Sequence, residues 1–478
     1  MKIRIFIFSL LLGSILNQTL AQDSSQLSFN RFYDLVLKNH PVAKQAGLLP
    51  EMARNEIRTA RGSFDPVLQT SIDNKTTKGI NSYSYFEPQI KIPTLIGLDL
   101  KAGMDQSSGV SVSPEAGKFD PVNGGTQNVN YQLLYAGVNL PVLRGLITDQ
   151  RRIGLRQAEL LSQMNRAEQI KVINKLFISA SKDFWNWQAA FQKNILMQKN
   201  YELALTRLNF IKNRIKGGEE KPIDSVEAWT ELKRREVLYT ESTMDLLNSK
   251  IALSNYLWDE YANPIQIADF VKPASSGNEI MELSKDSLAG LLAFAENSHP
   301  EVQKLGLKIN HYQFDRKLAI ENLKPQLNLE YYPFQTYTNG TEDVVPGLFS
   351  KNYKFGMSFY SSLFLRKERG KLQLSNLKIK DSELEFQQGR REVVSQVLMA
   401  YNEMDNFRQL VLIQRELVNN ASLLRDAEEI RFEAGESSLF LVNQRERTLI
   451  EAQAKLVELE AKYAQSKNNL QFVSGRSL

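Results

Sequence analysis

Few residues in this chain could support catalysis or metal binding. The sequence contains three histidines, His40, His299 and His311, and no cysteine. Metal sites and catalytic triads need several side chains that converge on one point, and histidines scattered this widely are more often structural or solvent-facing. The sequence also lacks a phosphate-binding glycine loop, an HExxH motif and a nucleophile elbow. We therefore expect no enzymatic activity, no cofactor, no metal site and no disulfide.

The aromatic and charged residues favour structural roles as well. Trp185 and Trp187 lie inside a long helical segment, where packing is the expected role of an indole ring. The 59 basic and 54 acidic residues are interspersed along the chain, as on solvated helix faces. Nucleic-acid-binding proteins concentrate positive charge on one face, so we expect no nucleic-acid partner.

The N-terminus has the features of an export signal. Lys2 and Arg4 precede an apolar run at residues 5–12, and Thr19-Leu20-Ala21 suits signal peptidase, so residues 1–21 are predicted to be removed. A membrane-spanning helix needs about 18 consecutive apolar residues, and no later stretch is that long.

The chain repeats itself at an offset of 259 residues. The aligned residues are His40, Pro41, Gly47, Leu48, Ala60, Pro66 and Leu68 with His299, Pro300, Gly306, Leu307, Ala319, Pro325 and Leu327. A second match, at an offset of 217, aligns Arg214, Gly218 and Glu219 with Arg431, Gly435 and Glu436. Repeated units of this kind usually bury their apolar faces against each other. We predict a first strand and long-helix repeat at residues 22–271, a join at 272–283 and a second repeat at 284–478.

Each repeat contains long segments that favour helix. Residues 155–216 have neither Gly nor Pro, residues 371–434 have only Gly389, and the segments 223–263 and 436–474 again have neither. In the last segment apolar residues recur every seven positions, as in a coiled coil. Glycines lie between the paired segments, at Gly217, Gly218 and Gly435, where they suit the end of a helix. The sequence therefore predicts two long antiparallel helical hairpins.

Three shorter segments alternate apolar and polar residues, as strands do. They are residues 353–359, 327–331 and 96–104. Small or polar residues on one side and aliphatic or aromatic residues on the other are typical of membrane β-barrel strands. A half-buried soluble sheet shows the same alternation, but the export signal and the long paired helices favour the membrane.

The first repeat is longer in its strand region. The distance from Pro41 to Gly145 is 104 residues, against 70 from Pro300 to Gly370. The surplus within residues 64–140 forms either a longer strand or an extra hairpin, and the sequence does not decide between them. Residues 107–125, rich in Ser, Gly and Pro, are predicted to form an outward loop.

The order of short motifs resembles that of the TolC-like outer membrane factors of tripartite efflux and type I secretion systems. The motifs are the two His-Pro pairs, the segment 140–145, residues 363–365 before Arg369-Gly370, and the hairpin ends 214–218 and 431–435. The likeness covers essentially the whole mature chain, and its style is similar to the Bacteroidetes branch of the family.

The resemblance implies an α+β membrane protein of defined architecture. The chain would be a tandem-repeat protomer of a trimeric transmembrane β-barrel that continues into a long periplasmic α-helical coiled-coil barrel. In the family the barrel has twelve strands, four from each chain. It lies in outer-membrane lipid and works as a passive exit channel beside an inner-membrane pump. Four strands cannot close a wide barrel alone, which agrees with a trimer.

The resemblance also assigns roles to the hairpin tips. Gly217, Gly218, Ala434 and Gly435 match the tips that dock a periplasmic membrane-fusion adaptor in the family. Leu441 and Gln444 stand where one member carries a ring of aspartates, so that gate is in doubt here. We hypothesise a negative constriction made by acids near the tips, which three-fold symmetry would turn into rings, at Glu219, Asp224, Glu227 and Glu436. Alternatively, these acids only stabilise the starts of helices.

A second function class stays open on the sequence alone. A soluble periplasmic coiled-coil scaffold or adaptor would need the paired helices but would have no reason for outward-apolar strands. The sequence does not identify the exported substrate.

Overall fold

The computed structural model describes residues 26–77, 79–109, 129–218, 221–274, 284–337 and 353–475. The predicted export signal, Glu219, and most of the predicted loop and join lie outside these residues. The chain forms two compact units, and each combines segments of both repeats. Unit 1 is Met1–Leu49, Ala167–Gln303 and Gln388–Leu478, and unit 2 is Pro50–Arg166 and Lys304–Gln387. The predicted repeat boundaries therefore stay a prediction.

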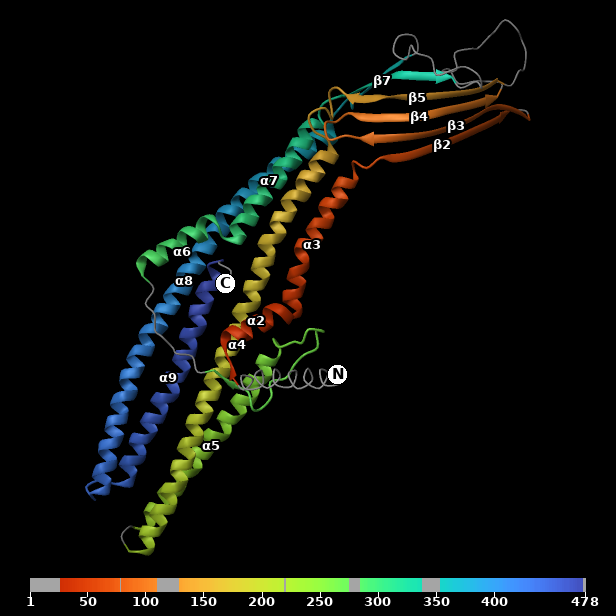
Figure 1. Cartoon of the computed structure of the whole chain (residues 1–478). Helices are drawn as coiled ribbons and strands as arrows, with labels where there is room; N and C mark the ends of the chain where they lie inside the picture. Colours follow the sequence, from red (N-terminus) through yellow and green to blue (C-terminus); the bar gives the residue numbers. More distant parts are fainter. Residues whose placement is uncertain are drawn as a thin grey trace, which may run out of the picture. The chain divides into compact units, whose positions relative to one another are not determined.

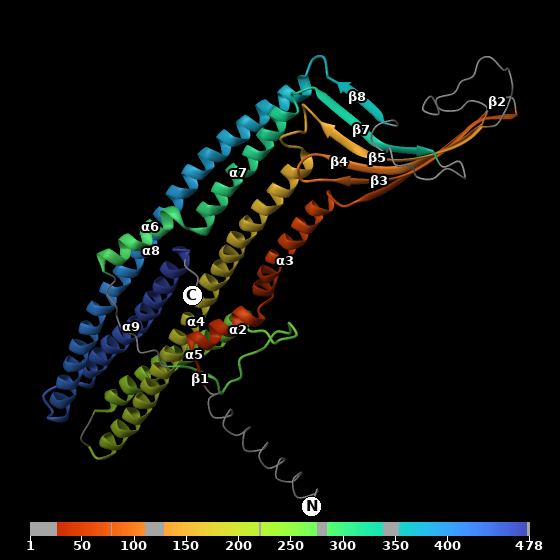
Figure 2. The same cartoon turned by 45° about the horizontal axis from the view of Figure 1, so that its top comes forward.

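Unit 2 contains one antiparallel sheet of six strands, labelled in Figures 1 and 2. The order in the sheet is β2 (Val67–Thr77), β3 (Ile80–Pro93), β4 (Asp99–Gly109), β5 (Val129–Pro141), β7 (Gln326–Tyr337) and β8 (Lys354–Tyr360). The surplus of the first repeat is thus an extra hairpin. Among the described residues, this sheet takes four strands from the first repeat and two from the second, so the expectation of four strands per chain is wrong.

The predicted strand at residues 96–104 begins later than its alternation suggests. Gly97 donates its N–H to the Thr94 carbonyl at 3.2 Å and has φ 89°, which glycine adopts without strain. Residues 94–98 are therefore the turn between β3 and β4, and the strand starts at Asp99.

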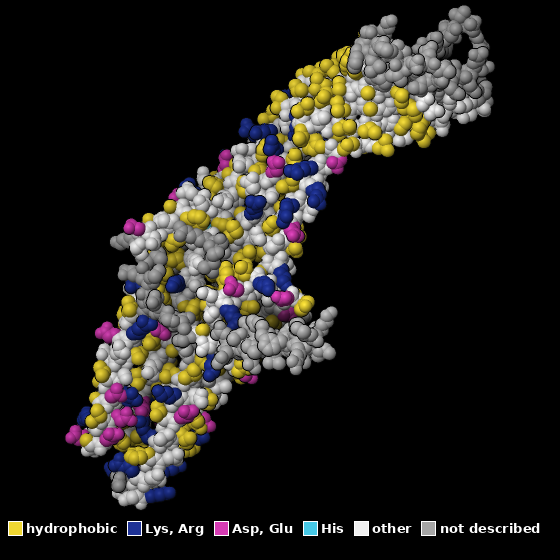
Figure 3. Space-filling view, viewed as in Figure 1, with side chains coloured by type: hydrophobic (Ala, Val, Ile, Leu, Met, Phe, Trp, Pro, Cys, Tyr) yellow, Lys and Arg dark blue, Asp and Glu magenta, His cyan; other side chains and the backbone are white. Residues whose placement is uncertain are grey.

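The two faces of the sheet differ in polarity. Register places odd-numbered residues of β2 to β5 on one face with even-numbered residues of β8 and of β7 from Gln326 to Glu330; beyond the bulge between β5 and β7, odd-numbered residues of β7 take that face. This polar face carries Lys91, Asp99, Lys101, Asp105 and Glu330. The opposite face exposes large apolar side chains, among them Leu68, Ile72, Ile90, Leu100, Leu134, Phe355, Met357 and Phe359. Figure 3 shows apolar side chains gathered over the sheet. The predicted alternation is confirmed.

Within unit 2, helices precede and follow the strands of the sheet. These are most of α3 (Pro41–Gly62) and α7 (Pro300–Glu321), and the first turns of α4 (Gln150–Lys216) and α8 (Arg366–Glu433). Both long helices continue into unit 1. At about 1.5 Å per residue, the 67 residues of α4 extend about 100 Å. Chains of this length need partners along their sides.

Unit 1 contains the two predicted helical hairpins. In the first, α4 is followed by α5 (Pro222–Ser254), and in the second, α8 is followed by α9 (Leu439–Val473). Smaller elements of this unit are α2 (Phe29–Asn39), α6 (Lys285–Asn297) and the parallel strands β1 (Gln26–Leu27) and β6 (Lys272–Pro273). None of the helices in the described part of the chain combines the length and hydrophobicity that a bilayer span requires.

Aromatic residues form the core beside α2. The rings of Phe184 and Trp187 lie 5.8 Å apart, and Phe184 also packs on Phe32 at 5.2 Å. Trp185 and Trp187 are buried, so the prediction that they serve packing is confirmed.

Two of the histidines cap helices at equivalent places in the repeats. The Nδ1 atom of His40 accepts the N–H of Val42 at 3.1 Å, and that of His299 accepts the N–H of Glu301 at 3.2 Å. These bonds satisfy N–H groups that the first turn of a helix leaves free. The structural role predicted for His40 and His299 is confirmed.

Candidate functional site

The hairpin tips are closed by glycines in the left-handed conformation. Gly218 has φ 78° and Gly435 has φ 75°, values that a residue with a Cβ rarely adopts. Gly218 donates to the Ile215 carbonyl at 3.0 Å, and Glu436 donates to the Arg431 carbonyl at 2.8 Å. These bonds end α4 and α8 as the sequence predicts.

The predicted constriction acids lie in different local settings. Asp224 accepts the Lys221 N–H at 3.1 Å, so it caps the start of α5. Glu227 accepts a hydrogen bond from Asn443 of α9 at 3.3 Å. Glu436 is exposed beside the glycine of the second tip, and Glu219 lies outside the described residues. The capping bond gives Asp224 a role in its own helix whatever its role in transport.

A buried set of ion pairs joins the two hairpins. Arg207 of α4 contacts Glu446 of α9 with 2.6 Å between Nη1 and Oε2, and Arg235 of α5 contacts the same carboxylate. Arg235 also contacts Glu231 at 3.1 Å, and Glu231 contacts Arg447 of α9 at 2.7 Å. We call these five residues the hairpin ion-pair network. The side chains of Glu231, Arg235 and Glu446 are at most 6% exposed.

Two members of the network, Glu446 and Arg207, have pKa values shifted toward their charged forms. Burial alone would raise the pKa of Glu446, but the hydrogen bonds and charges of Arg207 and Arg235 hold it below its ordinary value. Burial would lower the pKa of Arg207, but the Glu446 carboxylate raises it. Each charge is thus compensated by a partner on a neighbouring helix, which makes the contact between hairpins specific in position.

This network is not among the features predicted from the sequence. The available signal was spacing, because Glu231 and Arg235 each follow an apolar residue, Ala228 and Leu232, by three positions. Residues three apart share a helix face, so both charges belong to the buried face of α5. Interspersed charge predicts solvated helix faces, and the buried Glu231, Arg235 and Glu446 depart from that prediction.

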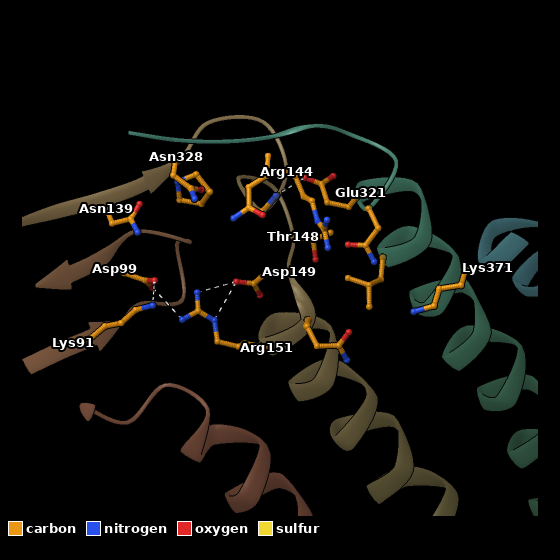
Figure 4. Close-up of a pocket in the computed structure, with 16 residues that line it drawn as sticks. Lys91, Asp99, Asn139, Arg144, Thr148, Asp149, Arg151, Glu321, Asn328 and Lys371 are labelled. Carbon is orange, nitrogen blue, oxygen red and sulfur yellow. Dashed lines mark hydrogen bonds and ion pairs between the residues drawn. The ribbon is translucent and has the colours of Figure 1, made fainter. Parts of the chain in front are cut away.

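A second charged cluster lies at the end of the sheet that adjoins the helices of unit 2 (Figure 4). Asp99 of β4 contacts Lys91 of β3 at 3.0 Å and Arg151 of α4 at 3.1 Å. Arg151 also contacts Asp149 at 3.1 Å. Burial would raise the pKa of Asp149, but the Arg152 N–H and the Arg151 and Arg152 side chains lower it. This chain of charges fixes the turn from β5 into α4.

These residues line a polar pocket of about 590 Å³ in unit 2. Arg144, Glu321, Asn328 and Lys371 also face it (Figure 4). Glu321 accepts the N–H of Gly145 at 3.0 Å, which holds the turn against α7. Among the described residues, no group of three or more acidic or histidine side chains is placed to hold a metal ion. The pocket offers charge of both signs to water and polar solutes.

Comparison with known proteins identifies the fold. Residues 291–476 match the sequence model of the family described as outer membrane efflux protein. No curated protein matches the chain significantly.

Solved channels share the architecture at low sequence identity. The CmeC outer membrane channel of Campylobacter jejuni has a TM-score of 0.61 and 14% identity, and the match covers 93% of this chain and 85% of that chain. The open MtrE outer membrane channel of Neisseria gonorrhoeae has a TM-score of 0.63 and 13% identity, and the match covers 93% of this chain and 88% of that chain. The outer membrane protein VceC of Vibrio cholerae has a TM-score of 0.61 and 13% identity, and the match covers 93% of this chain and 95% of that chain.

The likeness to the Bacteroidetes branch stays a prediction. The family model matches most of the second repeat, and the fold of the channels extends over 93% of the chain. Residues 291–476 therefore match the outer membrane efflux protein family, and the chain as a whole shares the fold of outer membrane channels, as the order of its motifs predicts.

Proposed function

We propose that this chain is one subunit of a passive exit channel in the bacterial outer membrane, with helices that extend into the periplasm. The observation that carries the proposal is the two-faced sheet of unit 2. One face exposes Leu68, Phe355 and Met357, each at least 60% accessible, which suits lipid. The other face carries charges such as the Lys101 and Glu330 pair, at 2.9 Å, which suits a water-filled lumen. A soluble scaffold has no use for the apolar face.

We further propose that three copies form the channel and that the tips dock a periplasmic membrane-fusion adaptor. Proteins of this family are channels rather than enzymes, so an inner-membrane pump would supply the energy for export. The docking surface would be Gly217, Gly218, Ala434 and Gly435, because a glycine tip leaves the backbone open to a partner. Gly218 and Gly435 have no atom within 4 Å of where a Cβ would stand.

The acids near the tips are proposed to narrow the channel. Asp224, Glu227 and Glu436 lie at or within about two helical turns of a tip glycine, and Glu219 follows Gly218 directly in sequence. Three-fold repetition of any one of them gives a ring of negative charge, which favours cations.

The channel proposal is tested by where the protein lies and what it conducts. Mature protein expressed in a Gram-negative host should be extracted from outer membranes only by detergent, run as a heat-modifiable trimer, and open steps of conductance in planar bilayers. A water-soluble periplasmic monomer would overturn the proposal and favour a scaffold.

The constriction proposal is tested by removing charge without removing the helix cap. Asp224→Asn keeps an oxygen that can accept the Lys221 N–H. It should reduce cation selectivity in bilayers, whereas Glu236→Gln, a change at an acid of α5 paired with Lys233 of the same helix, should not. Equal selectivity in both variants and the parent would remove Asp224 from the constriction.

A further inference from the structure

The sheet of unit 2 has two edge strands, each paired on one side only. In the part of the chain that the structure describes, β2 and β8 are the edges of the six-stranded sheet. Hydrocarbon offers no hydrogen bonds to free backbone N–H and C=O groups, so a sheet in a membrane must close on itself. Six strands are too few to enclose a wide lumen, so the edges need partners from other chains.

We propose that β8 of one copy pairs with β2 of the next, and that three copies close a barrel of eighteen strands, six from each. This inference rests on the proposed trimer and adds the number of strands and the seam between copies. It differs from the twelve strands that four per chain would give.

The directions of the edge strands fit this seam. Strand β2 leads away from α3, and β8 leads back to α8. All neighbours within the sheet are antiparallel, and an even number of strands makes the two edges run in opposite directions. The seam would therefore be antiparallel like every other pair in the barrel.

The slant of the sheet predicts the register of the seam. A line drawn across the strands passes through the paired residues Val67, Lys91, Lys101 and Gly137. It crosses the bulge of β7 at Tyr332, which lies against Gly137, and reaches Lys354, the partner of Tyr332. The line starts at Val67, the first residue of β2, and ends at Lys354, six residues before Tyr360, which is the last residue of β8. Three-fold symmetry places the helix-side ends of all copies at one height, so Val67 of the next copy should lie near Tyr360.

This register preserves both faces of the sheet. It sets Gln69 opposite Ser358 and Asp73 opposite Lys354 on the polar face, which places opposite charges across the seam. On the apolar face it pairs Leu68 with Phe359, where both side chains are at least 65% exposed in the single chain. A stagger of six residues per copy equals the number of strands per copy. That ratio corresponds to a strand tilt of about 35°, within the range of membrane barrels.

The wider barrel has a consequence for the outer mouth. Barrel diameter grows roughly linearly with strand number, so eighteen strands give about one and a half times the diameter of twelve at equal tilt. Barrels of sixteen to eighteen strands are wide enough for an open aqueous lumen.

Cysteine cross-linking tests the seam, because the parent chain has no cysteine. The variant Gln69→Cys/Ser358→Cys should form a covalent trimer on oxidation in outer membranes. The matched variant Lys101→Cys/Ser358→Cys moves the first cysteine from β2 to β4, at the same level along the barrel axis as Gln69. If the β2–β3 hairpin stayed outside the barrel, β4 would be the edge strand and would pair with β8 of the neighbouring copy. Asn328→Cys/Ser358→Cys joins residues paired within one copy and should give only monomer.

The outcomes separate this inference from the proposed function. Covalent trimer from the Gln69 variant alone supports eighteen strands, and covalent trimer from the Lys101 variant alone overturns it in favour of twelve. Cysteines at Val67 and Ser71, each combined with Ser358→Cys, test the neighbouring registers. A heat-modifiable trimer in which none of the Val67, Gln69 and Ser71 variants cross-links also overturns the seam, while the channel proposal stands. Absence of any trimer in the membrane would overturn the proposed function first.

Discussion

The buried arginine of the hairpin ion-pair network offers the sharpest test of what holds the two helical hairpins together. Arg235 is 2% exposed and contacts both Glu231 and Glu446. In Arg235→Met the side chain keeps its apolar length but leaves both carboxylates with fewer partners. Removing one member of a buried pair typically costs about 3–5 kcal/mol. Arg207 still compensates Glu446, and Arg447 still compensates Glu231, so we expect the lower end, about 3 kcal/mol.

Hydrogen exchange of the purified protein in detergent measures this loss locally. Backbone amides of α5 and α9 exchange when the helices open, and about 3 kcal/mol corresponds to exchange on the order of a hundredfold faster. The matched control is Lys193→Met. Lys193 contacts Asp245 at 3.2 Å between α4 and α5, but both side chains are more than 40% exposed, so the loss should be at most about 1 kcal/mol.

The sign of the pH dependence adds a second readout. Glu446 has a lowered pKa, so its contribution is fully present above its ordinary value of 4.5 and is lost as the pH falls through the folded value. At neutral pH the full effect of Arg235→Met should therefore appear. Equal exchange in the Arg235 and Lys193 variants would refute the reasoning.

Three further predictions follow from single residues. Gly435→Ala should destabilise the second tip by about 1 kcal/mol because φ is 75°, whereas Gly290→Ala inside α6 should stabilise; thermal unfolding in detergent compares them, and equal shifts would contradict the strain. Gly137→Val places side-chain atoms onto the Tyr331 carbonyl and Tyr332, so heat-modifiable trimer should be lost on gels but kept in Gly356→Ala. Burial lowers the pKa of His299 in the folded chain, so the imidazole is protonated at a higher pH in the unfolded chain than in the folded one. Protonation therefore favours unfolding, and the start of α7 should lose protection from hydrogen exchange as the pH falls below about 6.5. The variant His299→Asn should lose this dependence.

The helices and most strands could be predicted because each has a clear period. The long segments without Gly or Pro become α4, α5, α8 and α9, and the strand segments at 327–331 and 353–359 fall within or at the edge of β7 and β8. These patterns reflect how one element buries one face, which sequence spacing records directly.

The β2–β3 hairpin could not be predicted because its pattern is diluted. Outward positions of β2 include Thr70 and Asn74 beside Leu68 and Ile72, and Pro88 interrupts β3. Proline within a run argues against a strand, since it has no N–H to donate. The recorded pairing of β3 with β4 has a break at Glu87 and Pro88, which is the local cost of that proline.

The hairpin ion-pair network could not be predicted because it depends on helices far apart in sequence. Arg207 and Glu446 are separated by 239 positions, and the sequence around one residue does not indicate that the other is its partner. A charge on a helix is buried or solvated according to the neighbour packed on it, and that neighbour is known only once the two hairpins are placed side by side.

The unequal length of the repeats is compatible with one closed channel only because the surplus is a whole hairpin. A single added strand would reverse the direction of the β2 edge and make the seam with β8 parallel. Two added strands restore the direction and leave the polar face continuous, as the shared facing of Gln69, Gln89 and Gly103 across β2, β3 and β4 shows. A duplicated protomer can therefore widen its barrel in steps of one hairpin per copy, six strands per trimer, without altering how its helices continue from the strands.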